Sequence, residues 1–277
     1  MSVCKLLSRI GQGTDEASAE LSFGYGITNC PLTRFAVVLS ALLHDTDHPG
    51  IPNSELIKQN APVAAAYNNK SVAEQNSTDI GWGLLMQPQF VDLRRTIYCN
   101  EAEFRRFRQT IVMTIMATDI MDKELKSQRN VRWEKAFSTS QRALGQDDDA
   151  SVRTDRKATI VIEHLIQASD VAHTMQHWHI YRKWNENFFL ECYKAYLNGC
   201  GDKSPAETWY RGEMGFFDFY ILPLARKLKD CGVFGVSSDE YLNYAVQNRR
   251  EWEIKGQRIV EEMLEKARTK YGDKVEE

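Results

Sequence analysis

Residues 31–54 read PLTRFAVVLSALLHDTDHPGIPNS, and this stretch determines how the rest of the sequence is interpreted. Its first part, Pro31 to Leu43, is apolar on nearly every side, which predicts a helix buried in the middle of a helical bundle. Two imidazoles and two carboxylates follow at once in His44 to His48, and Pro49-Gly50 then stops the helix. We therefore predict a buried helix that carries a polar cluster at its C-terminal end.

Helical periodicity continues through the rest of the chain, whereas the strict alternation that is typical of strands is scarce. We predict further helices over residues 100–118, 157–179, 184–197 and 238–266. Polar segments that favour loops interrupt this pattern at Gln146–Ser151 and Asp202–Pro205. The sequence contains no internal repeat and no low-complexity linker, so we predict one all-α domain.

The composition is that of an ordinary globular protein, with 43% apolar residues, 26% charged residues and a formal net charge of −3. Because no basic tract is present, nucleic acid is not expected as a partner. No apolar run is long enough to span a bilayer, and the first residues are too polar for a secretory signal. The six cysteines are scattered, which is typical of free thiols in a reducing compartment. We expect a cytoplasmic protein.

The cluster from His44 to His48 is the strongest chemical signal in the sequence. Charged groups at the end of an apolar helix are partly buried, which is costly unless they are paired or bound to a metal. Imidazole and carboxylate together are good ligands for Zn²⁺, Mn²⁺ and Fe. Asp170 lies in a second apolar helical stretch. The alternatives are a solvated helix end and a core carboxylate paired with an arginine, but a shared site of His44, Asp45 and Asp170 explains both positions more simply.

The motif HDTDHPG followed by Asn53-Ser54 resembles the HDxDHPGxxN signature of the class I 3′,5′-cyclic-nucleotide phosphodiesterases. Further segments resemble motifs of that family in the same order: AYN at 66–68 with SVAE at 71–74, ATD at 117–119, ASD at 168–170, and EMGFFD at 213–218 with Pro223-Leu224. The resemblance extends from about Val3 to Lys266. It implies a compact multi-helix phosphodiesterase domain of the HD type over residues 1–277, with a core at about 3–266.

The resemblance also implies two divalent metal ions, zinc together with magnesium or manganese, and the hydrolysis of a cyclic nucleotide to a 5′-monophosphate. In the family pattern His44 and Asp170 bind the first metal, and Asp45 bridges both. This assignment agrees with the chemistry of two-metal sites, which lower the pKa of a shared water and neutralise phosphoryl oxygens.

The same resemblance implies roles for residues around the metals. The residues that would hold metal-bound waters are His48, Glu74 and Thr118. Phe216 would pack against the base of the nucleotide, and Glu213 would contact the edge of the base. Phe188 would form the opposite wall, although a place in the hydrophobic core explains this residue equally well.

The sequence departs from the family pattern before its first histidine, His44. The family places an HNxxHA segment upstream, whose first histidine is the general acid and whose second is a metal ligand. Ser2 to Ile10 is similar to the helix that follows that segment. We therefore expect a domain that is incomplete at its N-terminus. Its metal binding should be weakened, and its rate of hydrolysis should be roughly 10²–10⁴-fold lower because the general acid is missing. A clipped sequence and a pseudoenzyme are the alternatives, and the intact motifs favour the first.

Two further departures concern polar residues. Glu213 stands where the family has a purine-selecting glutamine. An ionised glutamate only accepts hydrogen bonds, and guanine offers two adjacent donors, so we expect a bias toward cyclic GMP over cyclic AMP. A protonated or outward-pointing Glu213 would remove this bias. Asn76 and Ser77 stand where many family members have a histidine pair, and they are able to hydrogen-bond a metal-bound water but not to replace an imidazole ligand.

We expect a metal-dependent enzyme of cyclic-nucleotide signalling, with the cyclic nucleotide as its predicted partner. One alternative is a catalytically dead relative that serves as a binding or regulatory module. Another is an unrelated metal-dependent phosphohydrolase, which leaves the order of the motifs unexplained. The resemblance is also compatible with a homodimer and with an upstream regulatory or membrane-anchored module, through which a cytoplasmic domain would attach to a membrane.

Overall fold

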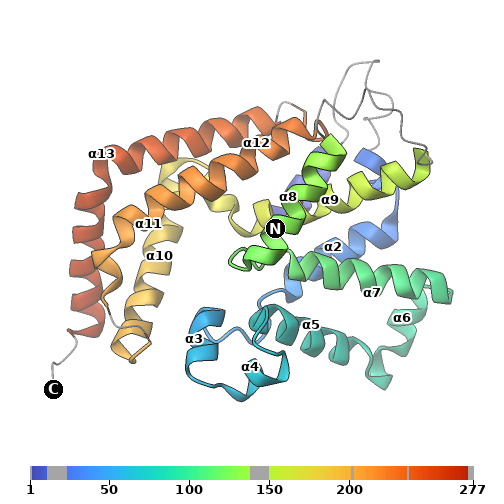
Figure 1. Cartoon of the computed structure of the whole chain (residues 1–277), viewed down its shortest axis with the longest axis horizontal. Helices are drawn as coiled ribbons and strands as arrows, with labels where there is room; N and C mark the ends of the chain where they lie inside the picture. The colour runs from blue at the N-terminus through green and yellow to red at the C-terminus, as the bar shows by residue number, and fades with distance from the viewer. Residues whose placement is uncertain (1, 11–23, 138–149, 201–202, 236, 274–277) are drawn as a thin grey trace.

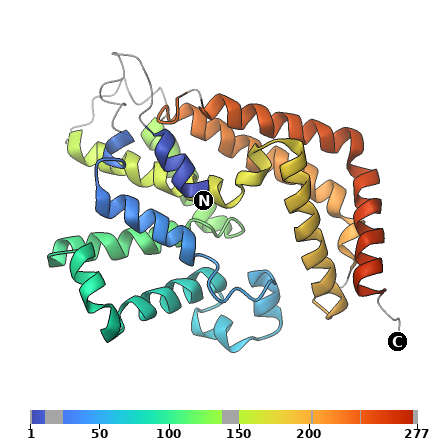
Figure 2. The same cartoon turned by 180° about the vertical axis from the view of Figure 1, so that it is seen from behind.

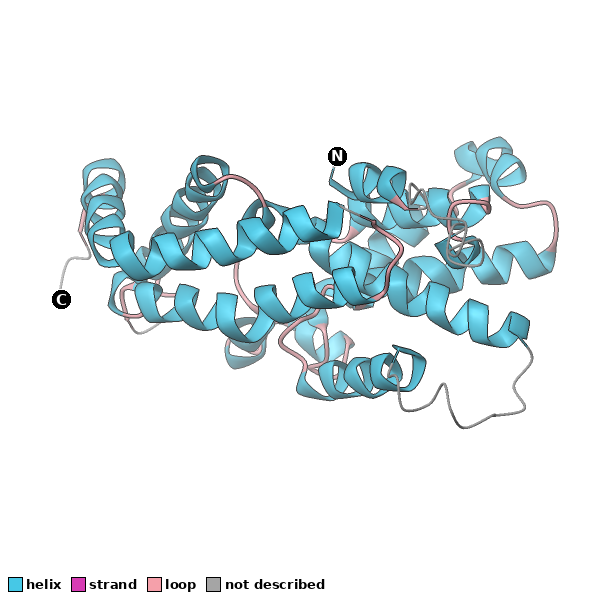
Figure 3. Cartoon of the chain, turned by 90° about the horizontal axis from the view of Figure 1, so that it is seen from above, coloured by secondary structure: helices cyan, strands magenta, loops and turns pink. Residues whose placement is uncertain are grey.

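The computed structural model describes residues 2–10, 24–137, 150–200, 203–235 and 237–273. Within these residues every regular element is a helix and no strand is present (Figure 3), which confirms the predicted all-α class. The α-helices, in chain order, are α1 (Ser2–Arg9), α2 (Pro31–Leu43), α3 (Asn53–Lys58), α4 (Pro62–Ala66), α5 (Val72–Leu85), α6 (Val91–Ile97), α7 (Glu101–Met116), α8 (Lys123–Phe137), α9 (Ala150–Asp170), α10 (Trp178–Leu197), α11 (Trp209–Phe216), α12 (Leu222–Asp230) and α13 (Ser237–Tyr271).

The helices form two groups that lie side by side (Figures 1 and 2). One group contains α2 and α5–α9, the other contains α10–α13, and α3 and α4 lie below them in the view of Figure 1. The long helix α13 turns a corner along its length and packs against α10, α11 and α12. The main hydrophobic core includes residues of α1, α2, α9, α12 and α13 and so joins the two groups, while a second core lies between α2, α5 and α7.

The apolar sequence of α2 predicted a helix that is buried on every side, but the structure buries only one of its faces. Its buried residues lie on one face that packs against α7 and α9: Thr33, Ala36, Val37 and Ser40. On the opposite face Leu42 is 77% exposed. Apolar composition alone overestimated the burial, because it does not reveal on how many sides a helix meets a neighbour.

A helix break at Asp170 corrects the continuous helix predicted over residues 157–179. Helix α9 ends at Asp170, and a short 3₁₀ helix, Ala172–Met175, follows before α10 begins. The Thr174 hydroxyl donates a hydrogen bond to the Val171 carbonyl at 2.7 Å and so stabilises the turn. Asp170 therefore lies at a helix C-terminus rather than in a helix interior.

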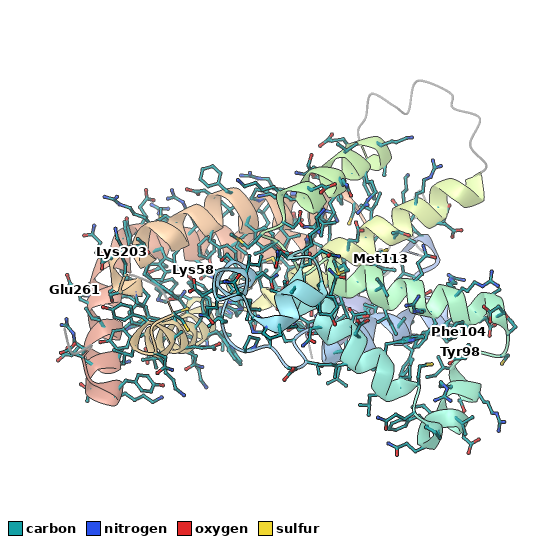
Figure 4. The ribbon with its side chains drawn as sticks, turned by 60° about the horizontal axis from the view of Figure 1, so that its bottom comes forward. Lys58, Tyr98, Phe104, Met113, Lys203 and Glu261 are labelled. Carbon is teal, nitrogen blue, oxygen red and sulfur yellow. The ribbon has the colours of Figure 1, made fainter. Side chains whose placement is uncertain are left out.

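The predicted start of α7 after Asn100 is confirmed. The Asn100 side chain accepts a hydrogen bond from the Glu103 amide at 2.9 Å, and Glu103 accepts one from the Cys99 amide at 2.7 Å. This reciprocal pair satisfies two backbone amides that have no partner within the helix. At the same corner Tyr98 and Phe104 lie side by side, with ring centroids 5.2 Å apart (Figure 4), which packs the end of α6 against α7.

Other helix ends differ from prediction by several residues. Helix α10 begins at Trp178 rather than Trp184, and α13 ends at Tyr271 rather than Lys266. Of the two predicted loops, residues 146–149 and 202 lie outside the described residues, and Ala150 already begins α9. None of the described helices combines the length and the apolar character that a transmembrane span requires.

Candidate active site

Two helix ends bring the predicted metal ligands together. His44 and Asp45 directly follow the last residue of α2, and Asp170 is the last residue of α9. Helices α2 and α9 pack against each other, so that His44 and Asp170 become neighbours although they are 126 positions apart in the sequence. The packing of two helices, rather than a local motif, therefore assembles this cluster.

The three side chains converge on a small volume. The His44 Nε2 atom lies 3.3 Å from Oδ1 of Asp170 and 3.2 Å from Oδ2 of Asp45. One potential ligand atom from each residue lies within 4.8 Å of the other two. The His44 side chain is 18% exposed, whereas that of Asp45 is 65% exposed. The imidazole therefore forms the floor of the cluster, and the carboxylates face outward, where an ion has access to them.

The His44 ring is oriented by the backbone. Its Nδ1 lies 3.1 Å from the Ala41 carbonyl oxygen, and a carbonyl only accepts, so Nδ1 carries a proton and Nε2 is the atom that faces the carboxylates. The hydrogen bonds to Asp170 and then to Asp45 raise the pKa of His44 to about 10, because the two carboxylates favour a positive charge at Nε2. A divalent cation satisfies the same preference, so these residues fit a metal ion.

The turn after the ligands is held in place by α5. The Ser77 hydroxyl donates to the Thr46 carbonyl at 2.8 Å, and the Asn76 amide donates to an Asp47 oxygen at 3.3 Å. Asp47 has a φ of 61°, a left-handed conformation that few residues other than Gly, Asn and Asp adopt. The structure thus engages Asn76 and Ser77 with the turn itself.

Glu74 and His48 lie on the same side of the site. Burial raises the pKa of the Glu74 carboxyl, although Asn53 donates a hydrogen bond to its Oε2 at 2.9 Å. The Asn53 side-chain oxygen accepts from the Ala73 amide at 2.9 Å, so Asn53 holds Glu74 to the first turn of α5. The charge of His48 acts on both Glu74 and Asp45. A carboxyl group whose pKa is raised in this way holds its proton more readily than an exposed glutamate does.

Thr118 lies just after the end of α7. Its hydroxyl donates to the Ile115 carbonyl at 2.7 Å, so the hydroxyl oxygen remains available as an acceptor. Gln167 of α9 donates to the Ala117 carbonyl at 2.9 Å, and the buried Asp119 accepts three hydrogen bonds from nearby hydroxyl and amide groups. The corner that carries Thr118 is therefore fixed against α9.

Glu213 of α11 points into the domain and joins a polar network. The Tyr181 hydroxyl donates to Oε2 of Glu213, and the Trp252 indole N–H donates to the same Tyr181 oxygen. Asn185 donates to Tyr181 at 3.3 Å and accepts from the Trp209 indole at 3.1 Å. Burial raises the pKa of the Glu213 carboxyl. Glu213 is thus not outward-pointing, and both Tyr181 and Asn185 interact with its carboxylate.

Two phenylalanines lie near Glu213. Phe216 follows it by three residues on α11, so the two side chains lie on one side of the helix, and its ring stacks on Tyr220 with centroids 5.3 Å apart. Phe188 projects from α10 with its ring 5.4 Å from that of Trp209, and it is 55% exposed. Phe188 is therefore not a core residue, which was the alternative that the sequence left open.

A family model described as 3′5′-cyclic nucleotide phosphodiesterase matches residues 27–233, which is more than half of the chain. The chain belongs to this family. The matched range includes the metal cluster and Glu213 with Phe216, and the membership confirms the resemblance that the motifs indicated.

Curated relatives carry names from the same phosphodiesterase family. The chain is 25% identical over 240 residues to a probable 3′,5′-cyclic phosphodiesterase of Caenorhabditis elegans. The aligned segment covers 80% of this chain and 32% of the relative. It is 27% identical over 209 residues to the 3′,5′-cyclic-AMP phosphodiesterase, isoform F, of Drosophila melanogaster. That alignment covers 70% of this chain and 29% of the relative. The chain thus spans about a third or less of the length of these relatives.

Solved phosphodiesterase domains share the fold. The phosphodiesterase domain of a RhoPDE fusion protein from the choanoflagellate Salpingoeca rosetta superimposes with a TM-score of 0.68 at 19% identity, over 95% of this chain and 76% of that one. A second structure of the phosphodiesterase domain of the rhodopsin phosphodiesterase from that organism gives a TM-score of 0.67 at 18% identity. At this identity the likeness establishes the all-α phosphodiesterase fold and nothing finer.

Sequence reasoning missed the residues that hold Glu213 and Glu74. Tyr181 and Asn185 lie one turn apart on α10, and polar residues at this spacing on an apolar helix were a usable signal. Trp252, in contrast, comes from a position 71 residues beyond Tyr181, and no local pattern reveals that contact. Asn53 belongs to the family motif that begins at His44, but its bond to Glu74 forms only once α5 is in place.

Four histidines outside the metal cluster, His164, His173, His177 and His179, occupy three elements. His164 lies on α9, His173 lies in the 3₁₀ helix, and His177 and His179 lie at the start of α10. Burial lowers the pKa of His164 to about 3, and its Nδ1 donates to the Ile160 carbonyl at 2.8 Å. His164 is therefore a neutral, buried residue.

Proposed function

We propose that this domain hydrolyses 3′,5′-cyclic nucleotides to 5′-monophosphates with two divalent metal ions, zinc together with magnesium or manganese. The cluster of His44, Asp45 and Asp170, whose ligand atoms lie within 4.8 Å of one another, is the observation that carries the proposal. Membership of the phosphodiesterase family supports the type of reaction.

His44 and Asp170 would hold the first metal, and Asp45 would bridge to the second. The 3.3 Å approach of His44 to Asp170 and the 65% exposure of Asp45 support this division of roles. When bound, the two ions supply an activated water and neutralise the phosphoryl oxygens. His48, Glu74 and Thr118 orient water around the cluster, and the raised pKa of Glu74 suits it to holding a proton there.

The nucleotide base would bind between Phe216 and Phe188. The exposed ring of Phe188 supports this placement, as does the position of Phe216 beside Glu213. The Glu213 oxygen that does not accept from Tyr181 would contact the edge of the base. Aromatic faces stack on any base, so the two rings provide affinity, and Glu213 provides selectivity.

We expect the purified chain to hydrolyse cyclic AMP or cyclic GMP slowly and only in the presence of metal. Turnover is slow because His44 supplies the only imidazole in the cluster among the described residues, and losing a general acid costs roughly 10²–10⁴-fold. Release of 5′-monophosphate is measured by chromatography with Zn²⁺ plus Mg²⁺, and again after chelation. Turnover that survives chelation contradicts the proposal. Nucleotide binding without any turnover favours the alternative, a non-catalytic binding module.

We expect Glu213→Gln to lower the preference for cyclic GMP over cyclic AMP by roughly fivefold, because a charged acceptor forms stronger hydrogen bonds than a neutral amide. Burial raises the pKa of Glu213, so the preference of the wild-type domain should increase with pH as the carboxyl ionises. The ratio of kcat/KM for the two nucleotides measures this, or the ratio of their dissociation constants by calorimetry. Glu207→Gln, at an exposed position, is the matched control. An unchanged ratio in Glu213→Gln would contradict the proposal that Glu213 selects cyclic GMP.

We further propose that the domain works in the cytoplasm as a homodimer within a longer signalling protein. A solved relative is described as part of a fusion protein, and the curated relatives are about three times as long as the matched segment or longer. An adjoining regulatory or membrane-anchored module would then control access to the site.

A further inference from the structure

A small cavity is lined by residues of α8, α9, α12 and the π-helical segment Phe217–Ile221, and its lining contains none of the three ligands of the metal cluster. Its volume is about 130 Å³, which is far below the roughly 300–1,000 Å³ that drug-sized ligands occupy. Its lining includes three cationic side chains, Lys126, Arg129 and Lys227, and no carboxylate among the described residues. We call this cavity the anion pocket. Its size excludes a whole nucleotide and admits a group of a few atoms.

The cations of the anion pocket have no carboxylate partner within ion-pair distance in the described part of the chain. Arg129 is only 6% exposed and donates to the Asp119 carbonyl at 2.9 Å, which uses one of its five N–H groups. The Lys227 ammonium donates to Asn130 Oδ1 at 2.7 Å and lies 3.4 Å from Nε2 of His164. Burial lowers the pKa of both Arg129 and Lys227. The carboxylates of Glu163 and Asp119 act on Arg129, and that of Glu134 acts on Lys227, but none of them lies within ion-pair distance. A bound anion would therefore add closer compensation for these charges.

A second feature of the anion pocket is an unpartnered donor. Tyr220 lines the pocket, and its hydroxyl is buried and has no hydrogen-bond partner among the described residues. Burial, and after it the charge of Asp170, raises its pKa, so the hydroxyl keeps its proton. A buried hydroxyl is normally paired with a protein group or an ordered water, and an anion in the pocket would also supply an acceptor for this one. His164 is neutral and accepts from Lys227, so it neither adds charge nor supplies that acceptor to Tyr220.

We propose that the anion pocket binds a phosphate group, either as inorganic phosphate or as the phosphate of a phosphomonoester. Arg129 is buried, Lys227 is partly buried and Lys126 is exposed, and three cations along one pocket match a dianion better than they match chloride or a single carboxylate. The guanidinium fork of Arg129 suits two phosphate oxygens, while Lys227 and the Tyr220 hydroxyl supply donors to the others. Phe219 at the edge of the pocket is 76% exposed and offers an apolar surface to the remainder of a phosphomonoester.

Phosphate binding is tested on the full chain after its metals have been removed on a chelating resin, because phosphate would also bind a metal at His44. We expect inorganic phosphate to raise Tm above the value in chloride of equal ionic strength, with one saturable site by calorimetry. Methyl phosphate in a parallel arm distinguishes the sources. Binding of both ions assigns the pocket to phosphomonoesters, and binding of inorganic phosphate alone assigns it to the free ion. Equal effects of phosphate and chloride overturn the proposal.

Two variants connect the binding to the pocket. Lys227→Met should weaken phosphate affinity by about tenfold or more, because a hydrogen bond to a charged group is lost. Lys229→Met is the matched control on the same helix. Lys229 is 51% exposed and paired with Asp239 at 2.7 Å, so its replacement should change the affinity less than twofold. Equal effects of the two substitutions would show that phosphate binds elsewhere.

The variant Tyr220→Phe separates a ligand role from a structural one. It keeps the ring that stacks on Phe216 and removes only the hydroxyl. Because that hydroxyl has no partner in the chain, Tm without phosphate should stay the same or rise, while phosphate affinity should fall several-fold. A lower Tm with unchanged phosphate affinity would assign the hydroxyl to the fold and overturn this part of the proposal.

Discussion

Replacing Asp170 with alanine should abolish tight binding of divalent metal by this domain, and with it the metal-dependent turnover. Asp170 is the one ligand that α9 contributes to the cluster, whereas His44 and Asp45 are neighbours after α2. We expect a loss of more than roughly 100-fold in affinity, because substitutions that only disturb the orientation of a ligand already cost about 10–100-fold. Calorimetric titration with Zn²⁺ and Mn²⁺ and the metal content after dialysis measure the effect.

The control for Asp170→Ala is Asp92→Ala. The Asp92 side chain is 89% exposed and pairs with Arg95 at 3.3 Å, and such surface pairs contribute only about 0–1 kcal/mol. The Asp92 variant should bind metal like the wild-type domain. The metal affinity of Asp170→Asn should lie between those of the Asp170→Ala and Asp92→Ala variants, since asparagine retains one oxygen ligand but loses the charge. Wild-type affinity in a folded Asp170→Ala protein would remove Asp170 from the ligand set.

Replacing Trp252 with alanine should lower the free energy of unfolding by roughly 3–5 kcal/mol, the usual cost of deleting a large aromatic side chain from a core. Trp252 is 1% exposed, and its ring lies 6.2 Å from that of Trp178 and 6.3 Å from that of Tyr181. Packing around it is tight, since a Cβ added at Gly256 would come within 2.3 Å of the indole. Urea unfolding followed by far-UV circular dichroism measures the loss.

Ile254→Ala is the control for Trp252→Ala on the same helix. Ile254 is 68% exposed, so its truncation should change stability by less than about 0.5 kcal/mol. Trp252→Phe keeps most of the ring volume but removes the N–H that Tyr181 accepts. Because Tyr181 also holds Glu213, this variant should change nucleotide affinity more than stability. Equal loss of stability in the Trp252→Ala and Ile254→Ala proteins would contradict the packing of α13.

Much of the metal cluster was predictable from the sequence. His44 and Asp45 are adjacent in a dense polar motif at the end of an apolar helix, where so many charged groups are costly unless a metal or a partner neutralises them. Asp170 was found by the same reasoning, as a carboxylate in an apolar helical stretch. The class of the fold was equally accessible, because helical periodicity depends only on the local geometry of the backbone.

Features that depend on neighbouring helices were not predictable in this way. The exposed face of α2 and the break after Asp170 contradicted the simplest periodic interpretation. The engagement of Asn76 and Ser77 with the turn before α3 requires α5 to lie against that turn. The inward orientation of Glu213 requires Trp252 from α13 to meet Tyr181 of α10.

The sequence by itself therefore determined the all-α class, the family, and the residues able to bind a metal, since each of these follows from residue type and local spacing. The tertiary structure alone decided that His44 and Asp170 meet, which polar groups hold Glu74 and Glu213, and that Arg129, Lys227 and Tyr220 face one small cavity. The physical reason is that side-chain pattern specifies the face that each helix buries, whereas the contacts between faces depend on how all the helices pack together.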